Sequence, residues 1–501
     1  MFLHNPPPGT TLNLLAAGEH PAQQRLAAEE LVAHNLSLLR LRQKIQQQGA
    51  PVLREDKTAK SAFLKQLDFQ LTDAQTRVAD EINKDIDSAV PMLRLVQGDV
   101  GSGKTVVAAM AALQAIANGK QAALMAPTEI LADQHRQNFE HWFKPLGIEV
   151  TWLTGKIKGK ARVLKLSAIA DGTAQMVIGT HALFQETVEF NDLGLSIIDE
   201  QHRFGVHQRL ALRQKGFVPT LSKETSGSAP HQLIMTATPI PRTLAMSAYA
   251  DLDCSIIDEL PPGRKPVDTL VLNNLRRNDV IERVRASCVN GRQAYWVCTL
   301  IEESDVLEAQ AAEVTASELQ LLLPELSIGL IHGRLKPREK IEIMEAFKNG
   351  TINLLVATTV IEVGVDVPNA SLMIIENSER LGLSQLHQLR GRVGRGTEAS
   401  HCVLLYSAPL SGNGNARLKI MRETTDGFKI AEKDLELRGP GEVLGTRQTG
   451  NMQLHIADLQ RDAHMLPDIK IIAETLLVNY PENVDALIRR WLGRNEQYAQ
   501  A

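Results

Sequence analysis

The stretch that decides the fold is Met92–Thr105, MLRLVQGDVGSGKT. It begins as an apolar run, continues into the pattern G-x-x-x-x-G-K-T, and an Ala-rich run follows directly. This order predicts a β-strand, a phosphate-binding loop and a helix. Glycine lets backbone N–H groups turn toward an anion without steric clash, and the start of the helix adds partial positive charge. We therefore expect a nucleoside triphosphate site on an α/β fold.

The polar residues of this loop have defined expected partners. The Lys104 ammonium would reach the β- and γ-phosphates, and the Thr105 hydroxyl would bind Mg²⁺. A second magnesium ligand should follow a neighbouring strand, and the apolar run LSIIDE ends in Asp199 and Glu200. We expect Asp199 to hold the ion and Glu200 to deprotonate the attacking water. ATP and Mg²⁺ are thus the expected cofactors. The loop residues expected to surround the phosphates are Gly98, Gly101, Ser102 and Gly103.

Composition limits the classes of protein that fit. A chain of 501 residues is too long for one ordinary core, so two large domains and additional segments are expected. Aromatic residues make up only 4%, which disfavours a single-strand binder that stacks many bases. The formal net charge is −4, so any nucleic-acid contact must come from local basic surface. One candidate is the run Lys156, Lys158, Lys160, Arg162 and Lys165, for which a solvated loop is the alternative.

Cysteine usage and hydropathy favour a cytoplasmic protein. Cys254, Cys288, Cys298 and Cys402 show no metal-binding spacing, and we expect all four to be buried, reduced thiols. No apolar run is long enough to span a bilayer, and the N-terminus lacks the pattern of a signal peptide. We expect no membrane contact.

The order of segments predicts two similar lobes. A Pro-rich strip and one long helix over His20–Gln48 should occupy residues 1–65. Apolar strands alternating with helices then predict a parallel-sheet lobe over 66–262 and a second over 263–410, joined through the linker Glu259–Val267. Residues 411–501 should form a helical hairpin, a Gly/Arg-rich loop and further helices. The fold class is α/β.

Several further segments extend the motif series. In order and spacing the series resembles that of superfamily-two helicases, whose lobes are RecA-like. The segments are LTDAQ (Leu71–Gln75), APTEILADQH (Ala126–His135), IGTHALF (Ile178–Phe184), TATPIPRT (Thr236–Thr243), ATTVIEVGVDVP (Ala357–Pro368) and QLRGRVGR (Gln388–Arg395).

The resemblance implies roles that suit the chemistry of the residues. Gln75 would pair with adenine, and Asp366 would also contact the nucleotide. Gln388, Arg392 and Arg395 would face the nucleotide from the second lobe, where an arginine stabilises charge on the γ-phosphate. Hydrolysis would then depend on closure of the two lobes. A solvated basic face is the alternative for these arginines, although the two glycines between them argue against it.

The resemblance also implies contacts with a DNA track. Thr128, Thr180 and Thr358 follow apolar strands and would donate hydrogen bonds to phosphates, which position DNA without reading its sequence. The alternative is that each threonine caps the following helix.

Within this superfamily the wording of two motifs resembles the RecG family of bacterial fork-remodelling helicases and its relative, the transcription-repair coupling factor. DEQH and the tail GTRQTG favour the RecG family. DEQHRFGV (Asp199–Val206) and the segment Ala416–Gly450 carry the resemblance, the latter matching a translocation motif of helical hairpin and loop. Arg417, Arg438 and Gln448 match the polar residues that link hairpin to loop. Asp434 and Glu436 lie close enough in sequence to pair with Arg438. An ordinary flexible loop with surface ion pairs is the alternative.

The resemblance implies branched and duplex DNA as substrates, with single-strand-binding protein as a further candidate partner and a monomer as the expected state. The family carries an N-terminal wedge domain with an oligonucleotide-binding barrel, and we expect this chain to correspond to the motor portion. Two other functions stay open: a duplex translocase that displaces roadblocks such as RNA polymerase, and an inactive DNA-binding remnant.

Overall fold

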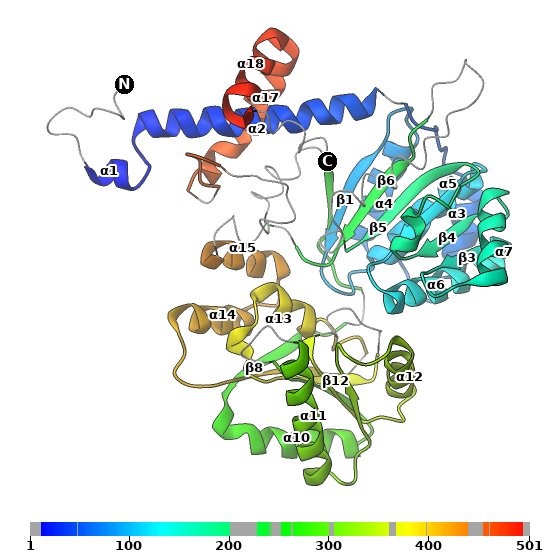
Figure 1. Ribbon diagram of the computed structural model, residues 1–501, viewed down its shortest axis with the longest axis vertical. Helices are drawn as coiled ribbons and strands as arrows, with labels where there is room; N and C mark the ends of the chain where they lie inside the picture. The colour runs from blue at the N-terminus through cyan, green and yellow to red at the C-terminus, as the bar shows by residue number, and fades with distance from the viewer. Residues whose placement is uncertain are drawn as a thin grey trace.

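The chain folds into two parallel-sheet lobes with a helical unit at one end, as a computed structural model shows (Figure 1). The structure describes residues 12–47, 49–200, 228–239, 241, 252–261, 264–299, 305–359, 367–396, 398–438, 454–459 and 461–493. The predicted α/β class with tandem RecA-like lobes is confirmed. The Pro-rich strip, most of DEQHRFGV and most of the Gly/Arg-rich loop lie outside the described residues.

The sheet of lobe 1 is seven-stranded and parallel, with the order β3-β4-β2-β5-β6-β1-β7. Its near-continuous apolar strands are buried because helices cover both faces. The strands are β1 (Leu93–Gly98), β2 (Gln121–Met125), β3 (Val150–Leu153), β4 (Met176–Gly179), β5 (Leu193–Asp199), β6 (His231–Thr236) and β7 (Asp253–Ile257). The helices are α3 (Lys57–Gln66), α4 (Asp73–Ile86), α5 (Lys104–Ala117), α6 (Glu129–Phe143), η2 (Lys144–Leu146), α7 (Gly159–Ala170) and η3 (His181–Phe184).

Lobe 2 repeats the plan with a six-stranded parallel sheet of order β10-β11-β9-β12-β13-β8. The strands are β8 (Val267–Asn273), β9 (Gln293–Val297), β10 (Ile328–Ile331), β11 (Leu354–Ala357), β12 (Ala370–Ile375) and β13 (Ser400–Tyr406). The helices are η5 (Asn274–Arg276), α10 (Arg277–Val289), α11 (Asp305–Leu322), α12 (Pro337–Lys348), η7 (Ser378–Arg380) and α13 (Leu383–Arg390).

Two strands and one cysteine depart from the sequence predictions. β7 and β8 were not predicted; each is an edge strand, so its side chains are only partly buried and the apolar signal is weak. β8 starts at Val267, within the stretch expected to be linker. Cys288, Cys298 and Cys402 are buried as predicted, and burial raises the pKa of each thiol to about 12. The prediction is wrong for Cys254, which is exposed on β7.

The two ends of the chain form one helical unit. The predicted long helix is α2 (Pro21–Gln46), preceded by α1 (Leu12–Ala16). α17 (Leu466–Asn479) and α18 (Pro481–Leu492), which follow η8 (Ala463–Met465), pack against α2 around a small apolar core (Figure 1). None of the described helices combines the length and apolar character that a bilayer crossing requires.

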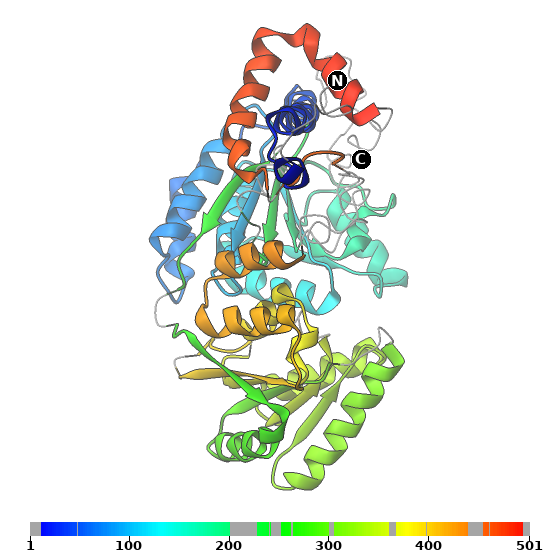
Figure 2. The same ribbon diagram turned by 90° about the vertical axis from the view of Figure 1, so that its left-hand side faces the viewer.

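A helical hairpin follows lobe 2. α14 (Gly412–Glu423) and α15 (Gly427–Arg438) lie on the side of lobe 2 that faces lobe 1 (Figure 2). Asp426 caps α15, since its carboxylate accepts the N–H groups of Phe428 (2.9 Å) and Lys429 (3.4 Å). The turn between the two helices therefore stands at the junction of the lobes.

Candidate active site

The phosphate loop lies between β1 and α5, as the sequence predicts. Gly101 (φ 80°) and Gly103 (φ 85°) adopt the left-handed backbone that glycine permits. The Ser102 hydroxyl is buried and has no hydrogen-bond partner among the described residues, so it remains free to donate to a ligand. These features suit a phosphate nest at the start of a helix.

Lys104 begins α5 and its ammonium lies beneath the loop. Its Nζ donates to the carbonyl oxygens of Gly98 (2.6 Å) and Asp99 (2.9 Å). Burial lowers the pKa of Lys104 from its ordinary value, whereas the carboxylates of Glu200 and Asp199 oppose that shift. The ammonium is therefore held among carboxylates and loop carbonyls at the site where phosphates are expected.

Gln75 supports the loop through contacts that were not predicted. Its Oε1 accepts the N–H of Thr72 (3.0 Å), which completes a capping box on α4, and its Nε2 donates to the Ser102 carbonyl (2.9 Å). A Cβ at Gly103 would collide with the Gln75 amide. Gln75 thus stabilises the loop by a hydrogen bond to its backbone. The pairing of Gln75 with adenine stays a prediction.

The acidic pair stands at the end of β5, beside the loop. Asp199 is 7% exposed, and its Oδ2 lies 2.7 Å from Nε2 of His135 on α6. Glu200 has φ 54°, a strained backbone for a residue other than glycine. Burial, followed by the charge of Asp199, raises the pKa of Glu200 to about 7. The Thr105 hydroxyl and the Asp199 carboxylate are oxygen donors of the kind that Mg²⁺ prefers, and their binding of the ion stays a prediction.

His135 is a site residue that sequence analysis missed. It closes the quoted motif APTEILADQH, but only the fold brings it to Asp199, 64 positions away. A buried imidazole in this position fixes the orientation of the carboxylate.

Two arginines of lobe 2 act on the site in lobe 1. The charge of Arg392 lowers the pKa of Glu200, in opposition to the larger effect of burial. The charge of Arg395 lowers the pKa of Lys104, in the same direction as burial. Gln388 lies on α13 and is 6% exposed. The structure therefore brings both predicted arginines to the cleft, and Asp366 lies outside the described residues.

Arg264, from the linker between the lobes, joins the two walls of this cleft. Its Nη1 donates to the Val100 carbonyl (2.6 Å) and its Nε to the Gly394 carbonyl (3.0 Å). Val100 also packs on Gly391, whose added Cβ would lie 2.7 Å from the Val100 Cβ. The phosphate loop thus contacts lobe 2 through Val100, a position at which the pattern G-x-x-x-x-G-K-T specifies no residue type.

The three threonines expected on the DNA track differ from one another. Thr128 caps α6, because its hydroxyl accepts the N–H of Leu131 at 3.3 Å. The hydroxyls of Thr180 and Thr358 are buried, and the described part of the chain offers neither a partner. The capping alternative thus describes Thr128, while donation to a phosphate stays a prediction for all three.

The hairpin residues contact lobe 2. Arg417 donates to the carbonyl oxygens of Leu381 (3.0 Å) and Glu379 (2.8 Å). Arg438 pairs with Asp434 at 3.0 Å, one of the two predicted partners, and the Glu436 carboxylate contacts Lys433 at 2.5 Å. Gln448 lies outside the described residues.

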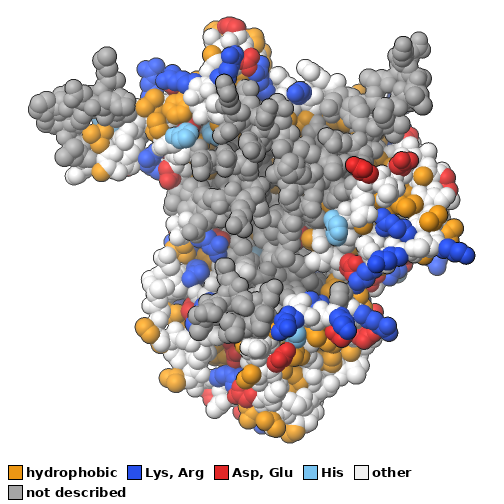
Figure 3. Space-filling view, in the orientation of Figure 1, with side chains coloured by type: hydrophobic (Ala, Val, Ile, Leu, Met, Phe, Trp, Pro, Cys, Tyr) orange, Lys and Arg blue, Asp and Glu red, His pale blue; other side chains and the backbone are white. Residues whose placement is uncertain are grey.

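Basic side chains line the margins where the two lobes face each other (Figure 3). They belong to the predicted run at the start of α7 and to the neighbourhood of α12, and α12 reaches α6 through Lys348 and Gln137 (3.4 Å). Those exposed are Lys156, Lys158, Lys160, Arg334, Lys336, Arg338 and Lys348. A local basic surface is therefore present although the formal net charge of the chain is −4.

Comparison with known proteins identifies the family. Residues 72–247 match the family model for DEAD/DEAH box helicases, 277–397 the helicase conserved C-terminal domain, and 424–489 the C-terminal part of domain 3 of the ATP-dependent DNA helicase RecG. ATP-dependent DNA helicase RecG of Escherichia coli (strain K12) is 63% identical over 500 residues, which are 100% of this chain and 71% of the relative. That of Haemophilus influenzae is 62% identical over 501 residues, again 100% of this chain and 71% of the relative.

A solved structure agrees. RecG bound to a three-way DNA junction matches with a TM-score of 0.70 and 42% identity, over 89% of this chain and 57% of that one. The chain thus spans little more than half of the RecG chain in that complex. Identity of this level over the full length shows that this chain belongs to the RecG family of ATP-dependent DNA helicases.

Proposed function

We propose that this chain is an ATP-driven translocase on duplex DNA that remodels branched DNA, as at stalled forks and recombination intermediates. The observation that carries the proposal is the arrangement of charges across the cleft. Lys104 and the acidic pair lie on lobe 1, while Arg392 and Arg395 act on them electrostatically from lobe 2. The complex of a related RecG with a three-way junction supports branched DNA as the substrate.

In the proposed reaction each residue of lobe 1 has one task. Backbone N–H groups from Gly98 to Gly103 and the Lys104 ammonium bind the phosphates, and the braced amide of Gln75 keeps the loop in shape. Thr105 and Asp199 would hold Mg²⁺, which would neutralise charge on the phosphates. Glu200 orients the attacking water and takes its proton, for which a pKa of about 7 is suited.

Lobe 2 completes the site only when the lobes approach. Gln388, Arg392 and Arg395 would contact the γ-phosphate side, with Asp366 near the nucleotide. Arg417, Arg438 and Gln448 would transmit the lobe movement through the hairpin to the loop that moves DNA. Thr128, Thr180, Thr358 and the basic margins would hold DNA phosphates. We further propose a monomer that acts in the cytoplasm, with single-strand-binding protein as a candidate partner.

The test is ATP hydrolysis with no DNA, single-stranded DNA, linear duplex and a four-way junction, each at low and moderate salt. Strong stimulation by duplex and junction, with weak stimulation by single strands, is expected. Lys104→Ala is the control, and it should abolish hydrolysis under every condition. Contacts with phosphates predict that stimulation weakens as salt rises.

Each outcome has a defined meaning. Preference for the junction over linear duplex would support branch recognition by this chain. Equal stimulation by both would favour a duplex translocase that displaces roadblocks. No stimulation by any DNA would refute the proposal and leave an idle remnant.

A further inference from the structure

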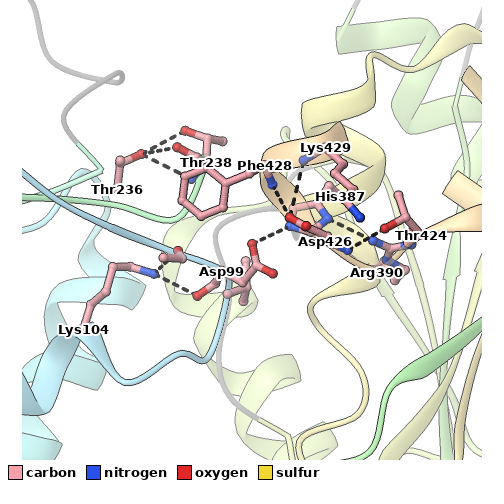
Figure 4. Close-up of polar contacts among 12 residues, drawn as sticks. Asp99, Lys104, Thr236, Thr238, His387, Arg390, Thr424, Asp426, Phe428 and Lys429 are labelled. Atoms are coloured by element: carbon pink, nitrogen blue, oxygen red, sulfur yellow. Dashed lines mark hydrogen bonds and ion pairs between the residues drawn. The ribbon is translucent and has the colours of Figure 1, made fainter. Parts of the chain in front are cut away.

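A chain of polar contacts links the phosphate loop to the helical hairpin, through side chains without a role in the chemistry proposed above (Figure 4). Asp99 is the second residue of the loop, and its Oδ1 lies 3.2 Å from Nε2 of His387 on α13. Nδ1 of His387 lies 3.1 Å from Nη2 of Arg390. Arg390 is 3% exposed, and its Nη1 donates to the carbonyl oxygens of Met421 and Thr424, both at 2.9 Å.

The direction of each hydrogen bond follows from the partners. A guanidinium only donates, so Nδ1 of His387 must accept from Arg390. An ionised carboxylate only accepts, so Nε2 of His387 carries the proton and donates to Asp99. Burial favours protonation of Asp99, but the hydrogen bond from His387, the charge of Lys104 and the Gly427 N–H lower its pKa below the ordinary value. The chain therefore runs in one direction, from Arg390 to the loop.

The hairpin closes this chain into a ring. Gly427, the first residue of α15, lies against the same carboxylate: an added Cβ would meet Oδ1 of Asp99, and the Gly427 backbone is one of the groups that lower the pKa of Asp99. Arg390 thus contacts the end of α14 and Asp99 lies against the start of α15, so both sides of the hairpin turn touch the chain of contacts that runs from Arg390 to Asp99. The start of a twelve-residue helix also favours the negative charge of Asp99.

Gly427 has no room for a side chain. An added Cβ would collide with Oδ1 of Asp99 and would lie 2.7 Å both from Nε2 of His387 and from Cγ of Pro239. Pro239 belongs to the segment TATPIPRT of lobe 1. The phosphate loop, that segment, α13 and the hairpin therefore meet at one backbone position.

We propose that Asp99, His387 and Gly427 form a coupling node that ties the position of the hairpin to the conformation of the phosphate loop. Asp99 and His387 are positioning residues, because they act through the loop backbone and through Arg390. Asp99 can do this because its own carbonyl accepts from Lys104 while its carboxylate binds the hairpin. Movement of the hairpin on DNA would thus reach the phosphate-binding lysine through one residue. The inference rests on the proposed function.

The test compares ATP hydrolysis with and without duplex DNA in His387→Ala, His387→Gln and Gly427→Ala. Coupling between two sites typically changes the affinity of one site by about 5- to 150-fold. Stimulation of hydrolysis by DNA should therefore fall about tenfold or more in the Ala variants. Basal hydrolysis and the KM for ATP should stay near wild type. His387→Gln should restore most of the stimulation, since its amide can donate to Asp99 and accept from Arg390.

Matched controls test general damage to the fold. His141→Ala removes a histidine that is 67% exposed and 4.0 Å from Asp68, and Gly412→Ala adds a Cβ that meets nothing within 4 Å at the start of α14. Both should keep wild-type stimulation. Far-ultraviolet circular dichroism and thermal unfolding confirm that each variant is folded.

The results separate the node from the function on which it rests. Wild-type stimulation in folded His387→Ala and Gly427→Ala would overturn the node, as would failure of His387→Gln to exceed the Ala variant. A wild-type protein without stimulation would instead refute the proposed function. A double-mutant cycle of Asp99→Asn with His387→Ala should be non-additive, and strictly additive losses would contradict a shared node.

Discussion

Glu200 is the residue whose charge state should set the pH dependence of the enzyme. Burial and the charge of Asp199 raise its pKa to about 7, and a general base works only when it is deprotonated. As the pH falls through 7 the base form is lost, so kcat/KM for ATP should decline on the acidic side with a midpoint near 7. A pH profile of DNA-stimulated hydrolysis measures this, because kcat/KM reports groups of the free enzyme.

Substitution of the same residue tests the assignment. Glu200→Gln should lower kcat by roughly a hundredfold or more, the usual contribution of a general base. The acidic limb should disappear from its residual activity. Survival of the limb at the same pH would show that another group titrates.

Whether a contact between residues could be predicted depends on how far apart the residues lie in the sequence. Lys104, Thr105, Asp199 and Glu200 could be predicted as site residues because a nucleotide needs these groups at fixed distances from strand ends. The contacts of Gln75 and His387 were not foreseen. Asp99 and His387 are 288 positions apart, and no local pattern marks two residues that meet only when two lobes pack.

At the scale of elements, the interlobe linker should act as a tie between the walls of the cleft. Arg264 donates to one carbonyl of the phosphate loop and to one beside Arg395, and a hydrogen bond from a charged group contributes about 1.5–3 kcal/mol. Arg264→Ala should therefore lower kcat/KM for ATP by about tenfold or more. Steady-state kinetics with duplex DNA provide the measurement.

Conservative substitution refines this test. In Arg264→Lys one ammonium cannot fork to both carbonyls, so an intermediate loss is expected. Arg276→Ala is the matched control, since that guanidinium is 60% exposed and pairs with Asp279 within one turn. An Arg264→Ala enzyme with wild-type kinetics would rule out a functional tie.

The elements show the same limit of prediction as the residues. The long helix α2 and the buried strands were expected, because burial on both faces leaves a continuous apolar run. β7 and β8 were not, because an edge strand keeps one side partly open and its apolar pattern is diluted by residues such as Asp253 and Asp268. Both strands flank the linker, so the two strands that were not predicted lie where the two lobes join.

At the scale of the whole molecule, a buried carboxylate adds to the apolar packing that joins α2 to the segment before α17 and α18. Glu30 on α2 is 0% exposed and accepts the N–H groups of His455 (2.6 Å), Ile456 (2.9 Å) and Ala457 (2.8 Å). These residues precede α17 and α18, which pack on α2. Since α15 ends at Arg438, this contact anchors the far side of the segment expected to move DNA.

Removal of that carboxylate should loosen the unit formed by α2, α17 and α18 while the lobes stay folded. Glu30→Ala removes the acceptor of three amides, of which that of Ala457 is buried and the other two are part-buried, and this should destabilise the unit by about 1–3 kcal/mol. Hydrogen exchange should then accelerate at residues 455–457 and in α17 but not in the two sheets. Glu29→Ala is the control, because that neighbour is 25% exposed and its ion pairs with Arg25 (3.6 Å) and Arg490 (3.4 Å) are long. Equal protection in Glu30→Ala and Glu29→Ala would show that apolar packing alone joins the ends. Loss of protection in Glu30→Ala alone would show that this carboxylate anchors residues 455–457 to α2.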